Sequence, residues 1–172
     1  YMPELPEVEV VKKSLENKLK NLSIKRVFIS NNKLRYRIDN KQFNKIKNQK
    51  IISIKRRSKY LLINLNKNFT ILIHLGMTGK FFIVDNNKKY KTSFYYSLKK
   101  NDTKHNHITL FFNKKIKLIY NDIRKFGFIK IYSNKDVFNC RHLASLGPEP
   151  LSRDFNLSYF NKYICNKKTK IK

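Results

Sequence analysis

The first residues of the chain place a proline and a carboxylic acid where covalent chemistry is feasible. The sequence begins with Tyr1, Met2, Pro3 and Glu4. A start methionine belongs at the first position, so we expect the natural chain to begin at Met2 and, once this residue is removed, at Pro3. An N-terminal proline is a secondary amine that can attack a sugar C1′ and form an iminium ion, while Glu4 shuttles a proton. As long as Tyr1 and Met2 are attached, the Pro3 nitrogen is an amide and the reaction is blocked.

A helix is predicted directly after this pair. It covers Pro6–Lys20, because a proline suits the first turn and acidic residues precede basic ones, as the helix dipole favours. Its apolar residues recur at helical spacing and form one buried stripe, made of Val8, Val11, Leu15 and Leu19. The positive end of the dipole and nearby lysines favour the neutral, reactive form of the Pro3 amine. For Glu7 and Glu9 we expect no role beyond matching the dipole.

The rest of the chain is mainly β-patterned, with polar turns such as NLNKN and FFNKK between short segments. The predicted strands are Ile24–Ile29, Ile51–Lys55, Tyr60–Leu65, Phe69–Leu75, Lys80–Val84, Ile108–Phe112, Ile116–Tyr120 and Phe126–Tyr132. So many short strands predict an α+β fold, mainly β, in which a two-layer antiparallel β-sandwich is flanked by helices.

Three other segments have weaker patterns. Asp85–Lys104 shows no clear period and is predicted to be a long loop. Asp136–Ser145 is predicted to be a helix ended by Gly147. Ser152 is predicted to cap a last helix, which carries Phe155, Tyr159, Tyr163 and Ile164.

The charge of the chain points to a polyanionic partner. Lys and Arg number 39 against 11 Asp and Glu, which gives a net charge of +28. A compact protein with this charge repels itself unless a polyanion neutralises it, so nucleic acid is the leading class of partner. Codon bias in an AT-rich genome is the alternative source of lysine, since asparagine is abundant too. We expect both to contribute.

Other classes of protein are disfavoured. No apolar run approaches the roughly 20 residues that span a bilayer, and the acidic N-terminal segment does not resemble a signal peptide. Cys140 and Cys165 are too few to form a four-ligand zinc site by themselves, and they fit a reducing compartment better than a disulfide scaffold. We expect a monomeric, cytoplasmic protein without membrane contact.

Five motifs occur in order along the chain: PELPEVE at 3–9, RRSKYLL at 56–62, HLGMTGK at 74–80, NDIRKFGF at 121–128 and LGPEPL at 146–151. Together they resemble the formamidopyrimidine-DNA glycosylase family, and PELPEVE and LGPEPL are closer to its oxidised-purine branch than to the endonuclease VIII branch. The resemblance implies a bifunctional enzyme of base-excision repair. Such an enzyme flips 8-oxoguanine or a formamidopyrimidine out of duplex DNA, cuts the glycosidic bond and cleaves the strand by β,δ-elimination.

The resemblance also implies the catalytic residues. Pro3 is the Schiff-base nucleophile and Glu4 is the acid/base. Lys59, in RRSKYLL, is the active-site lysine that holds the phosphate next to the lesion. His74 and Lys125 are further contacts to the DNA backbone.

Extruding a base leaves a gap in the duplex that costs a few kcal/mol, so other groups must fill it. The residues that match the family's void-fillers are Met77, Arg124 and Phe126. Methionine is flexible and apolar, and phenylalanine can wedge between bases. The planar donors of Arg124 can reach the cytosine left without its partner.

Each of these residues has an ordinary alternative. Taken singly, Met77 would be a core residue, Phe126 a packed strand residue and His74 a structural histidine. Within matched motifs we favour the functional role for all three. The rival for the whole chain is a small basic nucleic-acid-binding protein without catalysis, which explains the charge but not the motifs.

The resemblance implies two regions. Residues 3–146 are the N-terminal catalytic β-sandwich domain, and residues 147–172 are a linker and the first helix of a helix–two-turn–helix domain. The family's zinc finger lies beyond these 172 residues, so we expect no metal or other cofactor in this chain. Without that half of the DNA clamp, we expect low activity on intact duplex, the alternative being a DNA-binding fragment without catalysis.

Overall fold

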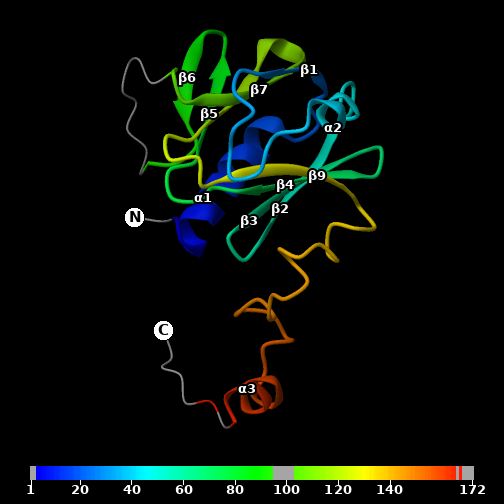
Figure 1. The fold of residues 1–172 in the computed structure, drawn as a ribbon, viewed down its shortest axis with the longest axis vertical. Helices are drawn as coiled ribbons and strands as arrows, with labels where there is room; N and C mark the ends of the chain where they lie inside the picture. The colour runs from blue at the N-terminus through cyan, green and yellow to red at the C-terminus, as the bar shows by residue number, and fades with distance from the viewer. Residues whose placement is uncertain (1–2, 95–102, 166, 168–172) are drawn as a thin grey trace.

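The computed structural model describes residues 3–94, 103–165 and 167 (Figure 1). The expectations for Tyr1, Met2 and the basic C-terminal tail therefore lie outside the described residues, apart from Lys167. The elements are α1 (Leu5–Leu19), β1 (Ile24–Ile29), α2 (Asn40–Asn44), β2 (Ile51–Arg57), β3 (Tyr60–Leu65), β4 (Phe69–His74), β5 (Lys80–Asp85), β6 (Lys88–Lys91), β7 (Asn106–Phe112), the 3-10 turn η1 (Asn113–Lys115), β8 (Lys117–Asn121), β9 (Phe128–Ser133) and α3 (Leu157–Ile164).

The strands form two antiparallel sheets that pack face to face (Figure 1). One sheet has the order β1-β7-β8-β5-β6, and the other has the order β2-β3-β4-β9. The predicted sandwich is thus confirmed. Helix α1 packs against β2 and adds its predicted stripe of four apolar residues to the core.

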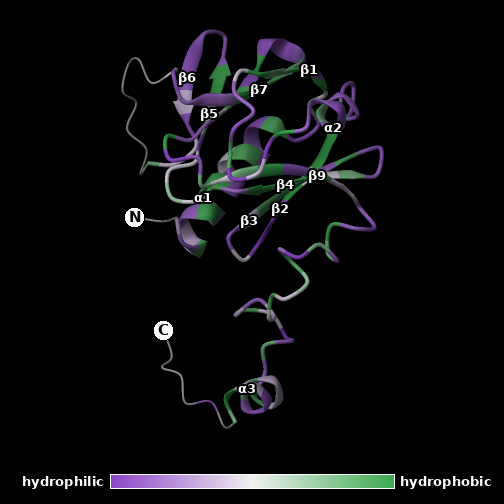
Figure 2. Cartoon of the chain, in the orientation of Figure 1, coloured by the Kyte–Doolittle hydropathy of each residue, from purple (hydrophilic) through white to green (hydrophobic). Residues whose placement is uncertain are grey.

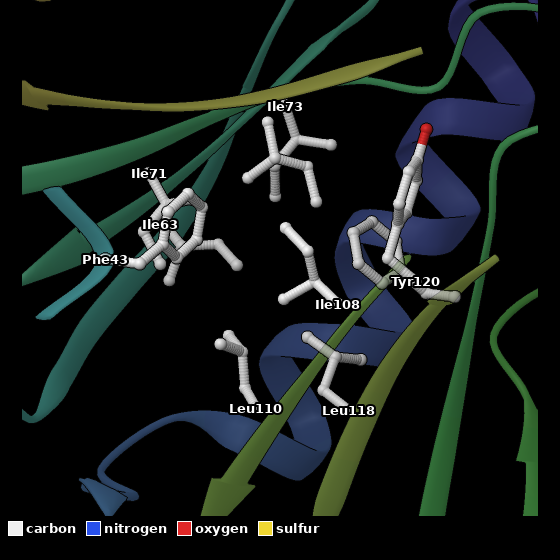
Figure 3. Close-up of a pocket in the computed structure, with 10 residues that line it drawn as sticks. Phe43, Ile63, Ile71, Ile73, Ile108, Leu110, Leu118 and Tyr120 are labelled. Atoms are coloured by element: carbon white, nitrogen blue, oxygen red, sulfur yellow. The ribbon is translucent and has the colours of Figure 1, made fainter. Parts of the chain in front are cut away.

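The main core lies between the sheets, where hydrophobic residues gather in both layers (Figure 2). Ile63, Ile71 and Ile73 come from the four-stranded sheet, and Ile108 and Leu118 face them from the other (Figure 3). They surround a cavity of only about 10 Å³ whose lining surface is entirely apolar. This cavity is a packing space of the core and offers no binding site.

The outer face of the four-stranded sheet is covered by the segment that follows β9. Leu62, Leu72 and Phe128 point to that face and pack against Val137 and Leu143. This is why β3 and β4 read as nearly continuous apolar runs, since both of their faces are buried.

Two predicted helices need correction. The segment 136–145 forms successive turns instead of a helix, with hydrogen bonds mostly to the third residue back. The apolar side chains that pack on the sheet are irregularly spaced along this segment. Their packing overrides the local helical pattern. The last helix is present, but Asn156 caps it by accepting from the Tyr159 amide, so its cap lies four residues after the predicted one at Ser152.

Other differences are small. The predicted loop Asp85–Lys104 contains β6, which pairs with β5 through a tight turn at Asn86 and Asn87, both with positive φ (45° and 66°). Asparagine tolerates that conformation, so the turn suits a hairpin. The part of this loop at 95–102 lies outside the described residues. Helix α2, capped by Asp39, was not predicted.

The C-terminal helix α3 lies apart from the two sheets (Figure 1). Its described side chains include exposed aromatic residues, such as Tyr163. No described helix is long and apolar enough to cross a membrane. The two regions predicted from the motifs stay a prediction.

Candidate active site and nucleic-acid interface

Glu4 and Lys59 are in contact. The Lys59 ammonium nitrogen lies 2.6 Å from a Glu4 carboxylate oxygen, although 55 positions separate them in the sequence. Glu4 caps the N-terminus of α1, where its amide donates to the Glu7 carboxylate at 3.0 Å. Lys59 lies in the turn between β2 and β3. Pro3 directly precedes Glu4, so the three predicted catalytic residues occupy one end of α1.

The same turn leads to His74. Tyr60 follows Lys59 and pairs with His74 across β3 and β4, with their ring centroids 5.0 Å apart. His74 also stacks on Phe128 of β9 at 5.8 Å. These two rings hold the imidazole in place beside the predicted catalytic residues.

His74 is arranged as a neutral hydrogen-bond donor. Its Nδ1 accepts from the Gly76 amide at 3.1 Å, which leaves the proton on Nε2. Burial lowers the pKa of His74, and the charges of Arg35 and Lys59 lower it further. At neutral pH the ring therefore presents an uncharged N–H, which suits a phosphate oxygen.

A pocket of about 690 Å³ opens next to His74. It is lined by Arg35, His74, Gly76, Met77, Arg124, Lys125 and Phe126. All five residues predicted to bind DNA thus line one pocket. Arg35 and Gly76 were not predicted, and three of the seven lining residues are Arg or Lys, with no acidic residue among them.

The pocket is formed by two chain segments that cross between the sheets. One joins β4 to β5 and carries Met77, and the other joins β8 to β9 and carries Arg124 and Phe126. Because β4 pairs with β9 and β5 pairs with β8, the two crossings run side by side.

The crossings approach each other so closely that side chains are excluded at two points. Gly76 has a φ of +62°, and a Cβ there would meet the Gly127 amide nitrogen at 2.5 Å. A Cβ on Gly127 would meet the Tyr120 hydroxyl and the His74 carbonyl. Both glycines are required for this backbone contact.

A buried carboxylate joins the two crossings. Asp122, which is fully buried, accepts from the Thr78 hydroxyl at 2.5 Å and from the Gly127 amide at 2.9 Å. The Thr78 hydroxyl oxygen in turn accepts from the Arg124 amide at 3.0 Å. Thr78 and Asp122 therefore fix Met77 relative to Arg124.

The outer part of the second crossing is exposed. Phe126 keeps 46% of its surface accessible, and the Arg124 guanidinium lies 4.8 Å from the centre of its ring. Lys125 between them has a positive φ of 59°, which turns the backbone so that its neighbours share one side. Phe126 is not a packed strand residue, since β9 begins at Phe128.

Some site residues were missed in the sequence. Thr78 and Asp122 lie within recognised motifs, but their spacing did not reveal that they contact each other. Arg35 lies in an irregular segment without any pattern, and only its amide bond to the Gly127 carbonyl places it at the pocket. Among the described residues no group of three or more His, Cys, Asp or Glu could hold a metal ion.

Known proteins share this combination of fold and motifs. Residues 2–129 match the model of the formamidopyrimidine-DNA glycosylase N-terminal domain. The chain is 40% identical over 171 residues to the formamidopyrimidine-DNA glycosylase of Rickettsia bellii, and 36% identical over 171 residues to that of Wolbachia pipientis, covering 99% of this chain and 58% of each relative. The chain belongs to the formamidopyrimidine-DNA glycosylase family, as its motifs indicated.

Solved structures agree with this assignment. The chain is similar to Lactococcus lactis Fpg in a complex with DNA containing an abasic site, with a TM-score of 0.76 and 28% identity over 94% of this chain and 56% of that one. It is also similar to the same enzyme in a complex with DNA containing N7-benzyl-Fapy-dG, with a TM-score of 0.75 and 29% identity over 94% of this chain and 55% of that one. The chain thus spans less than two thirds of the length of these relatives.

Proposed function

We propose that the protein removes oxidised purines, such as 8-oxoguanine and formamidopyrimidines, from duplex DNA and then cleaves the strand at the resulting abasic site. The observation that carries this proposal is the contact between Glu4 and Lys59 beside Pro3, next to a basic pocket lined by Met77 and Arg124. The relatives' names and their complexes with abasic-site and Fapy-containing DNA support the same chemistry.

In the proposed reaction, the Pro3 nitrogen forms a bond to C1′ while the bond from C1′ to the base breaks and the base leaves with a proton. Glu4 protonates the ring oxygen as the sugar opens, which gives an iminium ion. Loss of a proton from C2′ then expels the 3′ phosphate, and a second elimination expels the 5′ phosphate. Hydrolysis of the iminium releases Pro3.

Lys59 has two successive partners in this scheme. Its side chain is 31% exposed and that of Glu4 is 54% exposed, so their ion pair is worth at most about 1 kcal/mol. A phosphate with a full negative charge can replace Glu4 as the partner of Lys59 at little cost. DNA binding then frees Glu4 to exchange protons with the sugar.

The pocket residues take the void-filling role. Met77 and Phe126 enter the space that the extruded base leaves, and Arg124 donates to the base opposite. The His74 N–H and Lys125 contact phosphates on either side. The partner is damaged double-stranded DNA.

Borohydride trapping on abasic-site DNA tests the proposal. Protein that begins at Pro3 should form a covalent adduct through Pro3, because borohydride reduces the iminium. Protein that retains Tyr1 and Met2 should form none, because its Pro3 nitrogen is an amide. Glu4→Gln should greatly slow base excision.

Two results would contradict this scheme. An equal yield of Pro3 adduct from protein with Tyr1 and Met2 still attached would exclude the proline mechanism. DNA binding without any adduct from the protein that begins at Pro3 would support the non-catalytic rival instead.

A further inference from the structure

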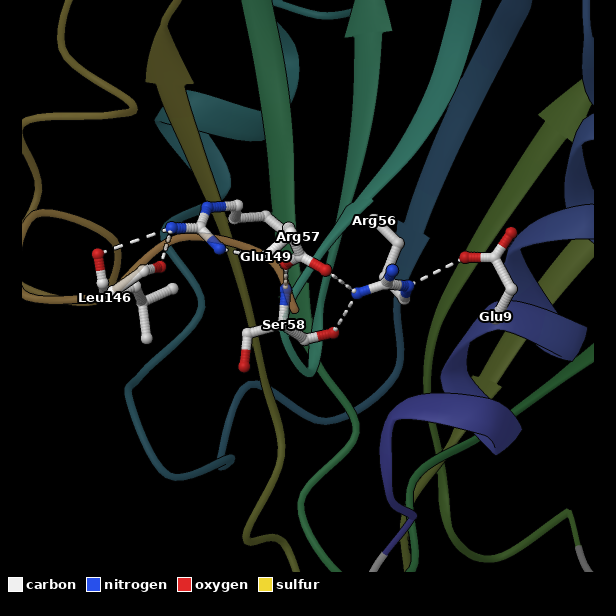
Figure 4. Close-up of polar contacts among 7 residues, drawn as sticks. Glu9, Arg56, Arg57, Ser58, Leu146 and Glu149 are labelled. Carbon is white, nitrogen blue, oxygen red and sulfur yellow. Dashed lines mark hydrogen bonds and ion pairs between the residues drawn. The ribbon is translucent and has the colours of Figure 1, made fainter. Parts of the chain in front are cut away.

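Glu149, in the LGPEPL motif, makes three charge-assisted hydrogen bonds to three consecutive residues, the last two of β2 and the first of the β2–β3 turn (Figure 4). Its carboxylate accepts from Arg56 Nη1 at 2.8 Å, from Arg57 Nη1 at 2.9 Å and from the Ser58 amide at 2.5 Å. Lys59 is the next residue. The motif thus holds the turn that presents the predicted active-site lysine.

The contacts extend to both sides of this turn (Figure 4). Arg56 Nε donates to Glu9 of α1 at 2.7 Å, so the helix that begins beside Glu4 is tied to the same guanidinium. Arg57 Nη2 donates to the carbonyl oxygens of Leu146 and Gly147. Glu9 therefore does more than match the helix dipole.

The turn needs this support. Ser58 has a φ of 50°, a conformation that costs a residue with a side chain about 1–3 kcal/mol unless its surroundings fix it. Burial alone would raise the pKa of Glu149, but the Ser58 amide and the two guanidinium groups outweigh it and hold the pKa below its usual value. The carboxylate therefore stays ionised at neutral pH and keeps the three donors aligned.

We propose that Glu149 is a positioning residue for Lys59, a role that rests on the function proposed above. In this role Glu149 acts through the β2–β3 turn and needs no contact with DNA. It holds the Ser58 backbone in its left-handed conformation and aligns Arg56 and Arg57, and this sets the direction in which Lys59 leaves the turn toward Glu4. Because Glu149 lies in the segment after the sandwich, the position of that segment controls the geometry of the catalytic lysine.

Glu149→Ala and Glu9→Ala form a matched pair for the test. Both remove a carboxylate partner of Arg56, but only the first removes the acceptor of the Ser58 amide. The assay is single-turnover strand cleavage of preformed abasic-site DNA by the gene product beginning at Pro3. Glu149→Ala should slow cleavage about tenfold, which corresponds to one weakened interaction in the transition state, and should weaken DNA binding no more than Lys59→Ala does. Glu9→Ala should cleave at the wild-type rate.

Two further measurements separate positioning from general stability. In a Lys59→Ala background, Glu149→Ala should cause no additional loss of rate, because both changes act on one group. Glu149→Gln, which keeps an acceptor for Ser58, should recover part of the rate. It should also fold if the alanine variant does not.

The outcomes are distinct. In one case the wild type is active, but the rate losses of Glu149→Ala and Lys59→Ala multiply in the double variant, or Glu9→Ala is as slow as Glu149→Ala. Either result would overturn the positioning role and leave the proposed function intact. A wild type beginning at Pro3 that cannot cleave abasic-site DNA would overturn the proposed function, and the positioning role with it.

Discussion

Thr78→Val replaces a hydroxyl with a methyl group of similar size and so cuts the link between the two chain crossings at the pocket. The Thr78 hydroxyl donates to the buried Asp122 carboxylate and accepts from the Arg124 amide. The Gly127 amide still donates to Asp122 at 2.9 Å, so the carboxylate keeps one strong partner. The Arg124 amide is exposed and can turn to water.

The expected cost follows from these contacts. A hydrogen bond to a charged group contributes about 1.5–3 kcal/mol, and the bonds that Asp122 keeps from the Gly127 amide and the Tyr120 hydroxyl place the loss near 2 kcal/mol. For a domain of this size each kcal/mol lowers Tm by about 2–4 °C, so Thr78→Val should melt about 4–8 °C below wild type. Freed from Thr78, Arg124 should also discriminate less between bases opposite the lesion.

Thermal unfolding, and excision by the whole gene product opposite each of the four bases, measure both effects. Thr78→Ser keeps the hydroxyl and should stay close to wild type in both assays. Thr70→Val is a matched control, because the Thr70 hydroxyl bonds only the neutral side chains of Asn64 and Asn134. It should lose some stability and no discrimination. Thr78→Val with wild-type Tm would show that the contact with Asp122 contributes nothing.

Three further outcomes are expected. In the whole gene product, Arg124→Ala should weaken discrimination between opposite bases, whereas Lys59→Ala should lower DNA binding and turnover without changing that discrimination; identical profiles of the two variants in excision assays would refute this difference in role. Burial, with Lys130 and Arg141 nearby, lowers the pKa of His142 to about 4, so the unfolded state binds more protons and stability falls as pH drops from about 6.5. His142→Phe should show a smaller fall in Tm between pH 7 and pH 5, and an equal fall would refute this assignment. Finally, a fragment limited to residues 1–172 should bind DNA with an affinity that falls steeply with salt and scarcely distinguishes lesion-containing from undamaged duplex, and lesion-selective binding by this fragment in a salt titration would contradict this.

The sandwich could be predicted because its signals are local. The stripe that ends at Leu19 follows helical spacing, and polar turns separate the strands within a few residues. The segment 136–145 was mispredicted because its conformation depends on contacts with Leu62 and Phe128, which are distant in the sequence. Local pattern carries no information about such contacts.

The same contrast between local signals and distant contacts holds for the site. Motifs identified the residues that face the pocket, but not the groups that hold them. Asp122 and Glu149 act through hydrogen bonds to Thr78 and Ser58, which are distant in the sequence. The motif that contains a carboxylate does not indicate which residues it will bond. Arg35 has no pattern around it and was found only from its place in the pocket.

The position of the pocket follows from strand pairing. Since β4 pairs with β9 in one sheet and β5 with β8 in the other, the chain crosses between the sheets twice at the same place. His74 is the last residue of β4 and pairs with Phe128, the first residue of β9. A slip of one residue in this pairing would turn His74 away from the pocket and separate Gly76 from Gly127. Ile71 and Ile73 pack in the main core, and Leu72 packs with Leu62 and Phe128 on the other face of β4. A slip would break the packing on both faces, so the packing also fixes the register of the site.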